Sequence, residues 1–161
     1  MKPSERKRST SGSGGWSISP ADLRGGRQFF VDTNVFLRFF TNDVPEQAAA
    51  AEALFLRAAA GEIELVTNTL VLAELVWVFE SYYRLPRADV EERVMAVALM
   101  EGLALPEADL ITEALSSYVE SNVDFIDAFN AAWMRQRGVQ RVITFDAKHY
   151  SRLNGIEVQP L

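Results

Sequence analysis

Cysteine is absent from the 161-residue sequence, and histidine occurs once, as His149. The absence of cysteine excludes a disulfide scaffold, a thiolate metal cluster and a cysteine nucleophile, and it is typical of a reducing cytoplasm. A single imidazole excludes a His-rich metal site and any mechanism that needs two histidines. No apolar run approaches the ~20 residues of a membrane span or forms a secretory signal. We therefore expect a cytoplasmic protein without membrane attachment.

Charge is unevenly distributed along the chain, whose formal net charge is −6. Residues 1–28 carry six basic and two acidic side chains, whereas the remaining 133 residues carry ten basic and twenty acidic ones. An acidic body argues against a nucleic-acid binder that uses a broad basic face. It remains compatible with an enzyme that meets phosphate through bound cations, because carboxylates are the ligands of Mg²⁺ and Mn²⁺.

The first 27 residues have the composition of a tail. Ser, Thr, Gly and Pro fill fourteen of these positions. Such a segment buries too little apolar surface to offset its ordering entropy. We expect a disordered, basic, Ser/Gly-rich extension over residues 1–27 and one folded domain over residues 28–161.

Short apolar runs alternate with helical patterns through the folded part. The predicted strands are 28–32, 63–67, 103–105, 141–145 and 156–158. The predicted helices are 34–40, 45–60, 69–83, 88–101, 106–120 and 123–137. This alternation predicts an α/β fold, a three-layer α/β/α sandwich with a short parallel sheet of four to five strands. Ligands of such sheets bind beyond the carboxyl ends of the strands.

Two aspartates follow predicted strands directly. Asp32 ends the predicted strand at 28–32, directly after the apolar run Phe29-Phe30-Val31, and Asp146 comes after the strand at 141–145. If both strands are parallel, both carboxylates open onto the same edge of the sheet. The alternative for Asp32 is an ordinary helix cap or Asx-turn.

Glu74 is the single charged residue between Leu70 and Phe79. The helix at 69–83 is apolar enough to be buried on most faces, and an unpaired buried carboxylate costs several kcal/mol. We therefore expect a compensating cation, with a metal ion as a good candidate. The alternative is a solvent-open stripe that Glu74 shares with Asn68 or Ser81.

Asp124 and Asp127 lie three residues apart near the start of the helix at 123–137. This spacing places them on adjacent parts of one face. Acids in a first turn also complement the helix dipole. We expect a structural role for Asp124, which is nearer the helix start, and a functional role for Asp127.

Four short motifs occur in order along this framework. They are Val31-Asp32-Thr33-Asn34, Ala73-Glu74-Leu75, Asp124-Phe125-Ile126-Asp127-Ala128 and Thr144-Phe145-Asp146. Together they closely resemble the PIN-domain nucleases, and within that group the VapC-type toxins of bacterial toxin–antitoxin pairs. The resemblance covers residues 29 to 161.

The resemblance implies hydrolysis of RNA phosphodiester bonds with Mg²⁺ or Mn²⁺, an antitoxin partner and a homodimer. The implied metal ligands and catalytic residues are Asp32, Glu74, Asp127 and Asp146. Asp124 matches an additional acid present in part of the family, and Asn34 and Thr144 match supporting polar residues. Divalent cations would relieve the mutual repulsion of four converging carboxylates.

The remaining polar residues near these motifs allow weaker assignments. Arg38 and Lys148 are the candidate phosphate-binding residues, because they lie close in sequence to Asn34 and Asp146. For His149 we expect a surface or packing role rather than that of a general base. Exposed apolar side chains of the helices at 45–60 and 69–83 are candidates for a protein interface.

Other functions remain open. A catalytically silent PIN-like scaffold would bind RNA or protein without cutting, although it would have no need of four acids. A phosphatase with an aspartate nucleophile commonly has a second Asp two residues after the first, where this chain has Asn34. A dinucleotide-binding domain is excluded by the lack of a Gly-rich loop after the first strand.

Overall fold

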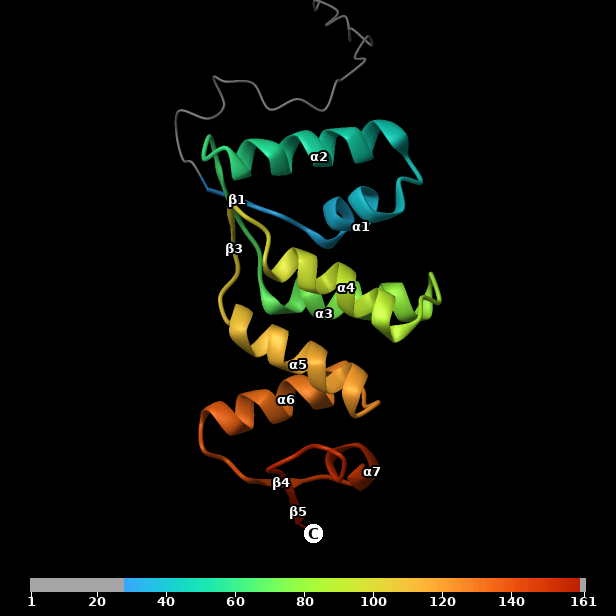
Figure 1. Ribbon diagram of the computed structural model, residues 1–161, viewed down its shortest axis with the longest axis vertical. Helices are drawn as coiled ribbons and strands as arrows, with labels where there is room; N and C mark the ends of the chain where they lie inside the picture. The colour runs from blue at the N-terminus through green and yellow to red at the C-terminus, as the bar shows by residue number, and fades with distance from the viewer. Residues whose placement is uncertain (1–27, 160–161) are drawn as a thin grey trace, which may run out of the picture.

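Residues 28–159 are described by the computed structural model, in which short strands alternate with helices (Figure 1). The strands are β1 (Gln28–Phe30), β2 (Glu64–Val66), β3 (Leu103–Ala104), β4 (Arg141–Ile143) and β5 (Glu157–Gln159). The helices are α1 (Thr33–Thr41), α2 (Pro45–Ala59), α3 (Thr69–Ser81), α4 (Arg87–Ala98), α5 (Ala108–Glu120), α6 (Phe125–Gln136) and the four-residue α7 (Ala147–Tyr150). The predicted α/β class is confirmed, and α7 is an addition to the predicted elements. The tail expected at 1–27 lies outside the described residues.

All five strands are parallel to their neighbours, but they form two sheets among residues 28–159. The first sheet has the order β1-β2-β3, and β4 pairs with β5 in the second. Phe29 lies opposite Leu65 and Val142 lies opposite Val158. A single sheet of four to five strands was expected. Apolar patterning identifies buried parallel strands, but it does not specify which strand lies beside which, and strands of two or three residues make few ladder bonds.

Polar residues start three of the helices. Asp32 caps α1 by accepting a hydrogen bond from the backbone N–H of Asn34, and Asn68 caps α3 through Val71 N at 3.1 Å. Asp124 caps α6 through Ile126 N at 2.8 Å. A side-chain oxygen at this position satisfies one of the free N–H groups of the first turn. The caps fix where each helix leaves its strand or loop.

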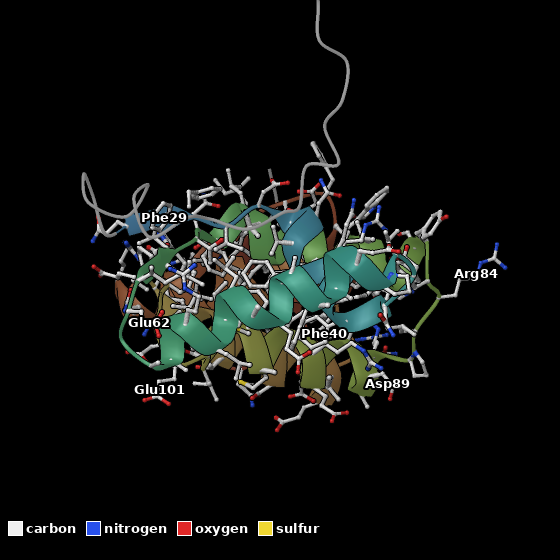
Figure 2. All side chains as sticks on the ribbon, turned by 90° about the horizontal axis from the view of Figure 1, so that it is seen from above. Phe29, Phe40, Glu62, Arg84, Asp89 and Glu101 are labelled. Carbon is white, nitrogen blue, oxygen red and sulfur yellow. The ribbon has the colours of Figure 1, made fainter. Side chains whose placement is uncertain are left out.

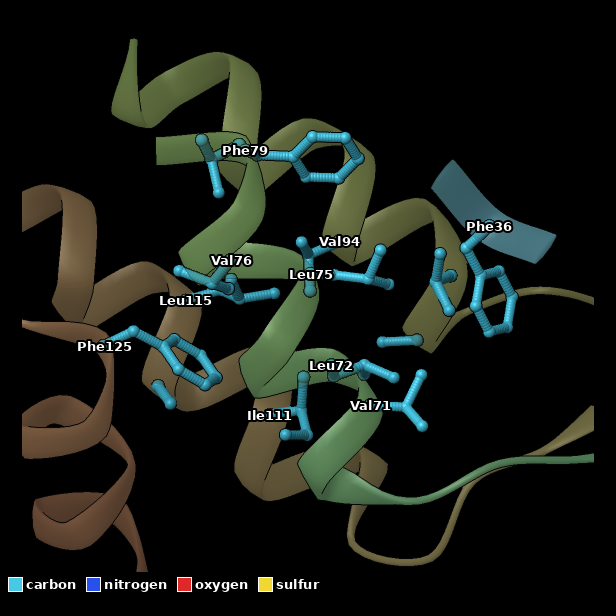
Figure 3. Close-up of a cluster of buried hydrophobic side chains, with 14 of the residues drawn as sticks. Phe36, Val71, Leu72, Leu75, Val76, Phe79, Val94, Ile111, Leu115 and Phe125 are labelled. Carbon is cyan, nitrogen blue, oxygen red and sulfur yellow. The ribbon is translucent and has the colours of Figure 1, made fainter. Parts of the chain in front are cut away.

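Helix α3 runs through the middle of the hydrophobic core (Figure 3). Its buried side chains are Val71, Leu72, Leu75, Val76 and Phe79. They pack against Phe36 of α1, Val94 of α4, Ile111 and Leu115 of α5, and Phe125 of α6. Burying each such side chain contributes on the order of 1.5–3 kcal/mol. The core therefore holds together helices from both ends of the chain.

The opposite face of α3 is open to solvent. Leu70 is 77% exposed and Trp77 is 66% exposed, and Glu74 and Ser81 lie on the same exposed face. The expectation that Glu74 is buried was wrong, and the alternative of a solvent-open stripe is what the structure has. The reason is that α3 uses only one side for the core, so its remaining apolar residues line the surface beside Glu74.

The elements are stacked along the long axis of the molecule, with α2 at one end and β4, α7 and β5 at the other (Figure 1). Seen from above, α2 lies nearest the viewer, and the labelled acidic side chains Glu62, Asp89 and Glu101 lie toward the edge of this view (Figure 2). None of the helices within residues 28–159 has the length and apolar character that a membrane crossing requires.

Candidate functional site

Three ligand-type side chains meet where α6 and α7 come together. The Nδ1 atom of His149 lies 2.8 Å from Oδ2 of Asp127 and 3.6 Å from Oδ2 of Asp146. One donor atom from each residue lies within 4.8 Å of the other two, and no other such group of three occurs in the part of the chain that the structure describes. Asp127 and His149 are half-buried, whereas Asp146 is exposed. The group is therefore accessible to an ion and to a substrate.

Helix α6 positions Asp127 in its first turn. The cap at Asp124 starts the helix, which agrees with the structural role expected for that residue. The following turns carry the buried residues Ala128, Ala131 and Ala132. These small side chains allow close packing on the neighbouring elements. Asp127 is thus held on a rigid helix at the edge of the core.

Asp146 and His149 are positioned by the turn between β4 and α7. The Thr144 hydroxyl accepts a hydrogen bond of 2.9 Å from the backbone N–H of Asp146. Tyr150 is buried at the end of α7, and its hydroxyl accepts a hydrogen bond of 3.3 Å from Asn130 of α6. Burial raises the pKa of Tyr150, so this hydroxyl stays protonated. These contacts attach α7 to α6.

Asp32 and Glu74 each accept a hydrogen bond from a residue in the first turn of α1. The buried hydroxyl of Thr33 donates a hydrogen bond of 2.5 Å to Oε2 of Glu74. Next to it, Asn34 Nδ2 donates to Oδ2 of Asp32 at 3.1 Å. Both carboxylates are exposed to solvent. The start of α1 therefore orients two acids from different elements.

Two of the four predicted acids, Asp127 and Asp146, belong to the group whose donor atoms lie within 4.8 Å of one another. Asp32 follows β1 of the three-stranded sheet, and Asp146 follows β4 of the two-stranded sheet. The expectation that both open onto the edge of one sheet is not met, because β1 and β4 belong to different sheets among the described strands. Asp127 and Asp146 do come together, whereas Asp32 and Glu74 are outside that group.

The two candidate phosphate-binding residues differ in their surroundings. Arg38 donates to Gln47 at 3.0 Å and to Asp43 at 2.5 Å. The hydrogen bond from Arg38 also lowers the pKa of Asp43. Lys148 is exposed, and no ion pair involves it within residues 28–159. Lys148 is therefore the more available cation.

Sequence reasoning missed two residues of these sites. His149 was expected to have a surface or packing role, but it contacts both Asp127 and Asp146. Its position three residues after Asp146 was the available signal, since this spacing places two side chains on one helical face. Thr33 gave no signal beyond its place between Asp32 and Asn34.

Asp127, Asp146 and His149 are called the α6–α7 group below. The donor atoms of this group fit a divalent cation. Two carboxylate oxygens provide hard, anionic ligands, and a neutral imidazole nitrogen is a common metal ligand. The exposed side of Asp146 leaves room for water or a phosphate oxygen in the remaining coordination positions. The arrangement can thus hold an ion and present it to a substrate.

Comparison with known proteins gives two findings. The sequence matches the family model described as PIN domain over residues 29–155. A curated relative, a VapC ribonuclease of Aquifex aeolicus (strain VF5), is 25% identical over 130 residues. The aligned part is 81% of this chain and 95% of that relative. The matched residues 29–155 include both groups of acids.

Proposed function

Because the chain belongs to the PIN domain family, we propose that it is a divalent-metal-dependent endoribonuclease acting as the toxin of a toxin–antitoxin pair. It hydrolyses RNA phosphodiester bonds in the cytoplasm. Similarity to the VapC ribonuclease supports this activity. The single observation that carries the proposal is the group of Asp127, Asp146 and His149 within reach of one ion.

Asp127 and Asp146 hold Mg²⁺ or Mn²⁺ in this proposal. A divalent cation held by these residues would supply an acidified water as nucleophile and would offset the negative charge of the phosphate. Asp127 is fixed by α6, and Thr144 restrains the backbone of Asp146 through its 2.9 Å hydrogen bond. The helix and this hydrogen bond thus fix the backbone from which each carboxylate extends.

Asp32 and Glu74 are proposed as the other two acids of the site on the resemblance alone. Asn34 restrains Asp32, and Thr33 restrains Glu74. Asp32 and Asp124 each cap a helix, but the resemblance gives Asp124 only as an additional acid present in part of the family. We therefore assign Asp124 to helix initiation and keep Asp32 and Glu74 as ligands to be tested.

Basic side chains near the α6–α7 group favour the binding of RNA. Residues 135–152 carry five Lys and Arg side chains against one acid, Asp146. Arg135 and Arg137 form ion pairs with Glu113 and Glu107, whereas Lys148 is exposed next to the site. This exposed lysine attracts the phosphate backbone even though the chain as a whole is acidic. RNA therefore approaches from this end of the molecule.

The exposed face of α3 is proposed to bind protein. Leu70 and Trp77 lie along it, and Tyr82 at its end is 75% exposed. Apolar side chains spaced along one helix face suit a partner helix or a second copy of the chain. Following the resemblance, we assign this face to the antitoxin or to a homodimer. The mass of the protein alone and with its antitoxin distinguishes the two.

A catalytically silent PIN-like scaffold is the second candidate. It is favoured by one observation, namely that Asp32 and Glu74 lie outside the group formed by Asp127 and Asp146. A scaffold would bind RNA without metal and would not cut it. Metal binding therefore separates the two functions before any RNA target is known.

The test is the melting temperature in EDTA and across a Mn²⁺ titration, for wild type and Asp146→Asn. We expect a saturable rise in the wild type, because an ion that binds the folded state stabilises it by RT ln(1 + [L]/Kd). Asp146→Asn should lose that rise. Asp109→Asn, which removes an exposed acid of the first turn of α5, should retain it.

Cleavage of a mixed RNA pool in Mn²⁺ completes the test. Product that forms with wild type and Asp109→Asn but not with Asp146→Asn supports the nuclease. If the wild type binds RNA, shows no change of melting temperature with Mn²⁺ and does not cleave the RNA pool, the scaffold function is established instead.

A further inference from the structure

His149 is the one nitrogen donor beside the acids of the α6–α7 group. We propose that its Nδ1 atom ligates the ion together with Asp127 and Asp146, and that the site consequently prefers a first-row transition metal ion over Mg²⁺. This inference rests on the proposed metal-dependent function and names a ligand and a metal class for it.

The distances between the donor atoms agree with shared coordination. Ligand bonds of about 2.0–2.2 Å put neighbouring donors of one ion about 3 Å apart and opposite donors about 4.3 Å apart. His149 Nδ1 lies 2.8 Å from Asp127 and 3.6 Å from Asp146, and the whole group spans less than 4.8 Å. All three side chains thus reach one ion with small rotations.

The position of His149 in the chain supports direct ligation. Asp146 and His149 belong to the same short turn of α7, three residues apart, so they face the same side. The burial of Tyr150 and its contact with Asn130 fix α7 against α6, which carries Asp127. The imidazole of His149 is therefore held in contact with Asp127 and Asp146.

Donor chemistry then sets the metal preference. Mg²⁺ takes oxygen ligands almost exclusively and dehydrates reluctantly. Imidazole suits borderline ions, and affinity for a nitrogen-containing site rises from Mn²⁺ through Fe²⁺ to Co²⁺ and beyond. A site with two carboxylates and one imidazole therefore favours Mn²⁺, Fe²⁺ or Co²⁺, whereas two carboxylates alone would not discriminate against Mg²⁺.

A competing role for His149 makes a different prediction. As a hydrogen-bond donor to Asp127, the ring would carry its proton on Nδ1 and stay outside the coordination sphere. As a ligand, Nδ1 must be free of the proton, which then resides on Nε2. The tautomer and the metal–nitrogen bond are both measurable.

The single histidine permits a direct experiment on protein without a histidine tag. Labelling with ¹⁵N-histidine marks His149 alone. At pH ~8, where free imidazole is neutral, pulsed EPR of the Mn²⁺-loaded protein should show a directly bonded nitrogen whose coupling changes with the isotope. An absent nitrogen coupling in protein that binds Mn²⁺ would overturn the inference.

Metal titrations give the second readout, with Co²⁺, Mn²⁺ and Mg²⁺ used one at a time. We expect His149→Asn to lower the Co²⁺ affinity about tenfold or more while the Mg²⁺ affinity changes less than about threefold. Gln140→Asn, an exposed neutral residue before β4, should change neither affinity.

The outcomes separate this inference from the proposed function. If wild type binds Mn²⁺, Asp146→Asn does not, and His149→Asn keeps the wild-type affinities, the acid site is retained and the histidine ligand is rejected. If wild type binds none of the three ions, both proposals fail. Loss of the nitrogen coupling and of Co²⁺ selectivity in His149→Asn establishes the ligand.

Discussion

The hydroxyl of Thr33 donates a 2.5 Å hydrogen bond to Glu74, which joins the first turn of α1 to the exposed face of α3. Thr33 is 3% exposed, whereas Glu74 is open to solvent. Glu74 therefore needs no buried cation to compensate its charge, and its orientation comes from a neighbour of Asp32. The bond therefore holds Glu74 at the start of α1, the helix that Asp32 caps.

Replacing Thr33 with valine tests this contact. Thr33→Val removes the hydroxyl at nearly constant volume, and water can still reach Glu74, so we expect a loss of only about 0.5–1.5 kcal/mol in the free energy of unfolding. Metal-dependent cleavage should fall by about 10–100-fold, because an oriented ligand carboxylate loses its support. Urea unfolding and initial cleavage rates measure the two effects.

Thr41→Val is the matched control. Thr41 is the last residue of α1, and its hydroxyl donates to the Leu37 carbonyl at 2.8 Å. This variant should lose a similar amount of stability and keep its cleavage rate. Equal cleavage by Thr33→Val and Thr41→Val would remove Glu74 from the site.

Much of the fold was predictable from local pattern. The helix predicted at 69–83 from apolar spacing is α3, and the PIN-domain resemblance of the chain is confirmed by the family match over residues 29–155. Strand neighbours were not predictable, because Phe29–Phe30 and Val142–Ile143 are both short apolar runs with no register signal. Consequently the single sheet was expected and two were found.

The candidate site was predictable only in part for the same reason. Asp127 and Asp146 come together because α6 and α7 are close in sequence, whereas Asp32 depends on the placement of β1. The exposure of Glu74 depends on which face of α3 the core takes. Such tertiary choices are not encoded in any one segment.

Asp127 should be needed for metal binding and not for folding. We expect Asp127→Asn to abolish cleavage and the Mn²⁺-induced rise in melting temperature. In EDTA the variant should be as stable as wild type or slightly more stable, because the repulsion with Asp146 is relieved and a half-exposed contact with His149 contributes at most about 1 kcal/mol. A large loss of stability in EDTA would show that Asp127 is structural.

Lys148 should contribute to RNA affinity. In EDTA, which prevents cleavage, Lys148→Gln should weaken binding to a single-stranded RNA and reduce the slope of log K against log salt by about 0.7. Arg38→Gln should have a smaller effect, because Asp43 already pairs with that guanidinium.

Arg84→Gln is the control for charge alone, since this side chain extends outward at the side of the molecule from the loop between α3 and α4 (Figure 2). An equal loss of RNA affinity in Arg84→Gln and Lys148→Gln would mean that RNA affinity depends only on the net charge of the protein.

Alkaline pH should destabilise the protein through Tyr118. Burial raises the pKa of Tyr118 above its usual value near 10, and the hydrogen bond of 2.8 Å to Glu80 adds to the shift. Above pH ~10 the unfolded chain releases this proton while the folded chain keeps it, so the free energy of unfolding falls as the pH rises. Below that pH the contribution is fully present.

Tyr118→Phe isolates this effect. The variant should be less stable by about 1–2 kcal/mol at neutral pH, because Glu80 loses its donor. Its stability should decline less steeply between pH ~10 and ~11 in urea titrations. Tyr82→Phe, at a residue 75% exposed, should leave the pH profile unchanged. Parallel profiles for wild type and Tyr118→Phe would assign the alkaline loss to other groups, including buried Tyr150.

The approach of β3 to α2 should depend on Gly102. Gly102 has φ of +79°, and a Cβ there would lie 2.4 Å from the carbonyl carbon and oxygen of Ala58. Gly138 has a similar φ of +69° with nothing within 4 Å of a built Cβ. Comparing Gly102→Ala with Gly138→Ala therefore separates steric contact from backbone strain.

We expect Gly138→Ala to lower the free energy of unfolding by about 1–2 kcal/mol, the cost of a left-handed alanine. Gly102→Ala should lose at least about 2 kcal/mol more, because backbone atoms of Ala58 cannot yield without shifting α2. Gly102 also accepts the hydrogen bond of 3.0 Å from Leu65 N, so the shift would weaken the β2–β3 pair. Equal losses in urea unfolding would show that α2 moves freely relative to the sheet.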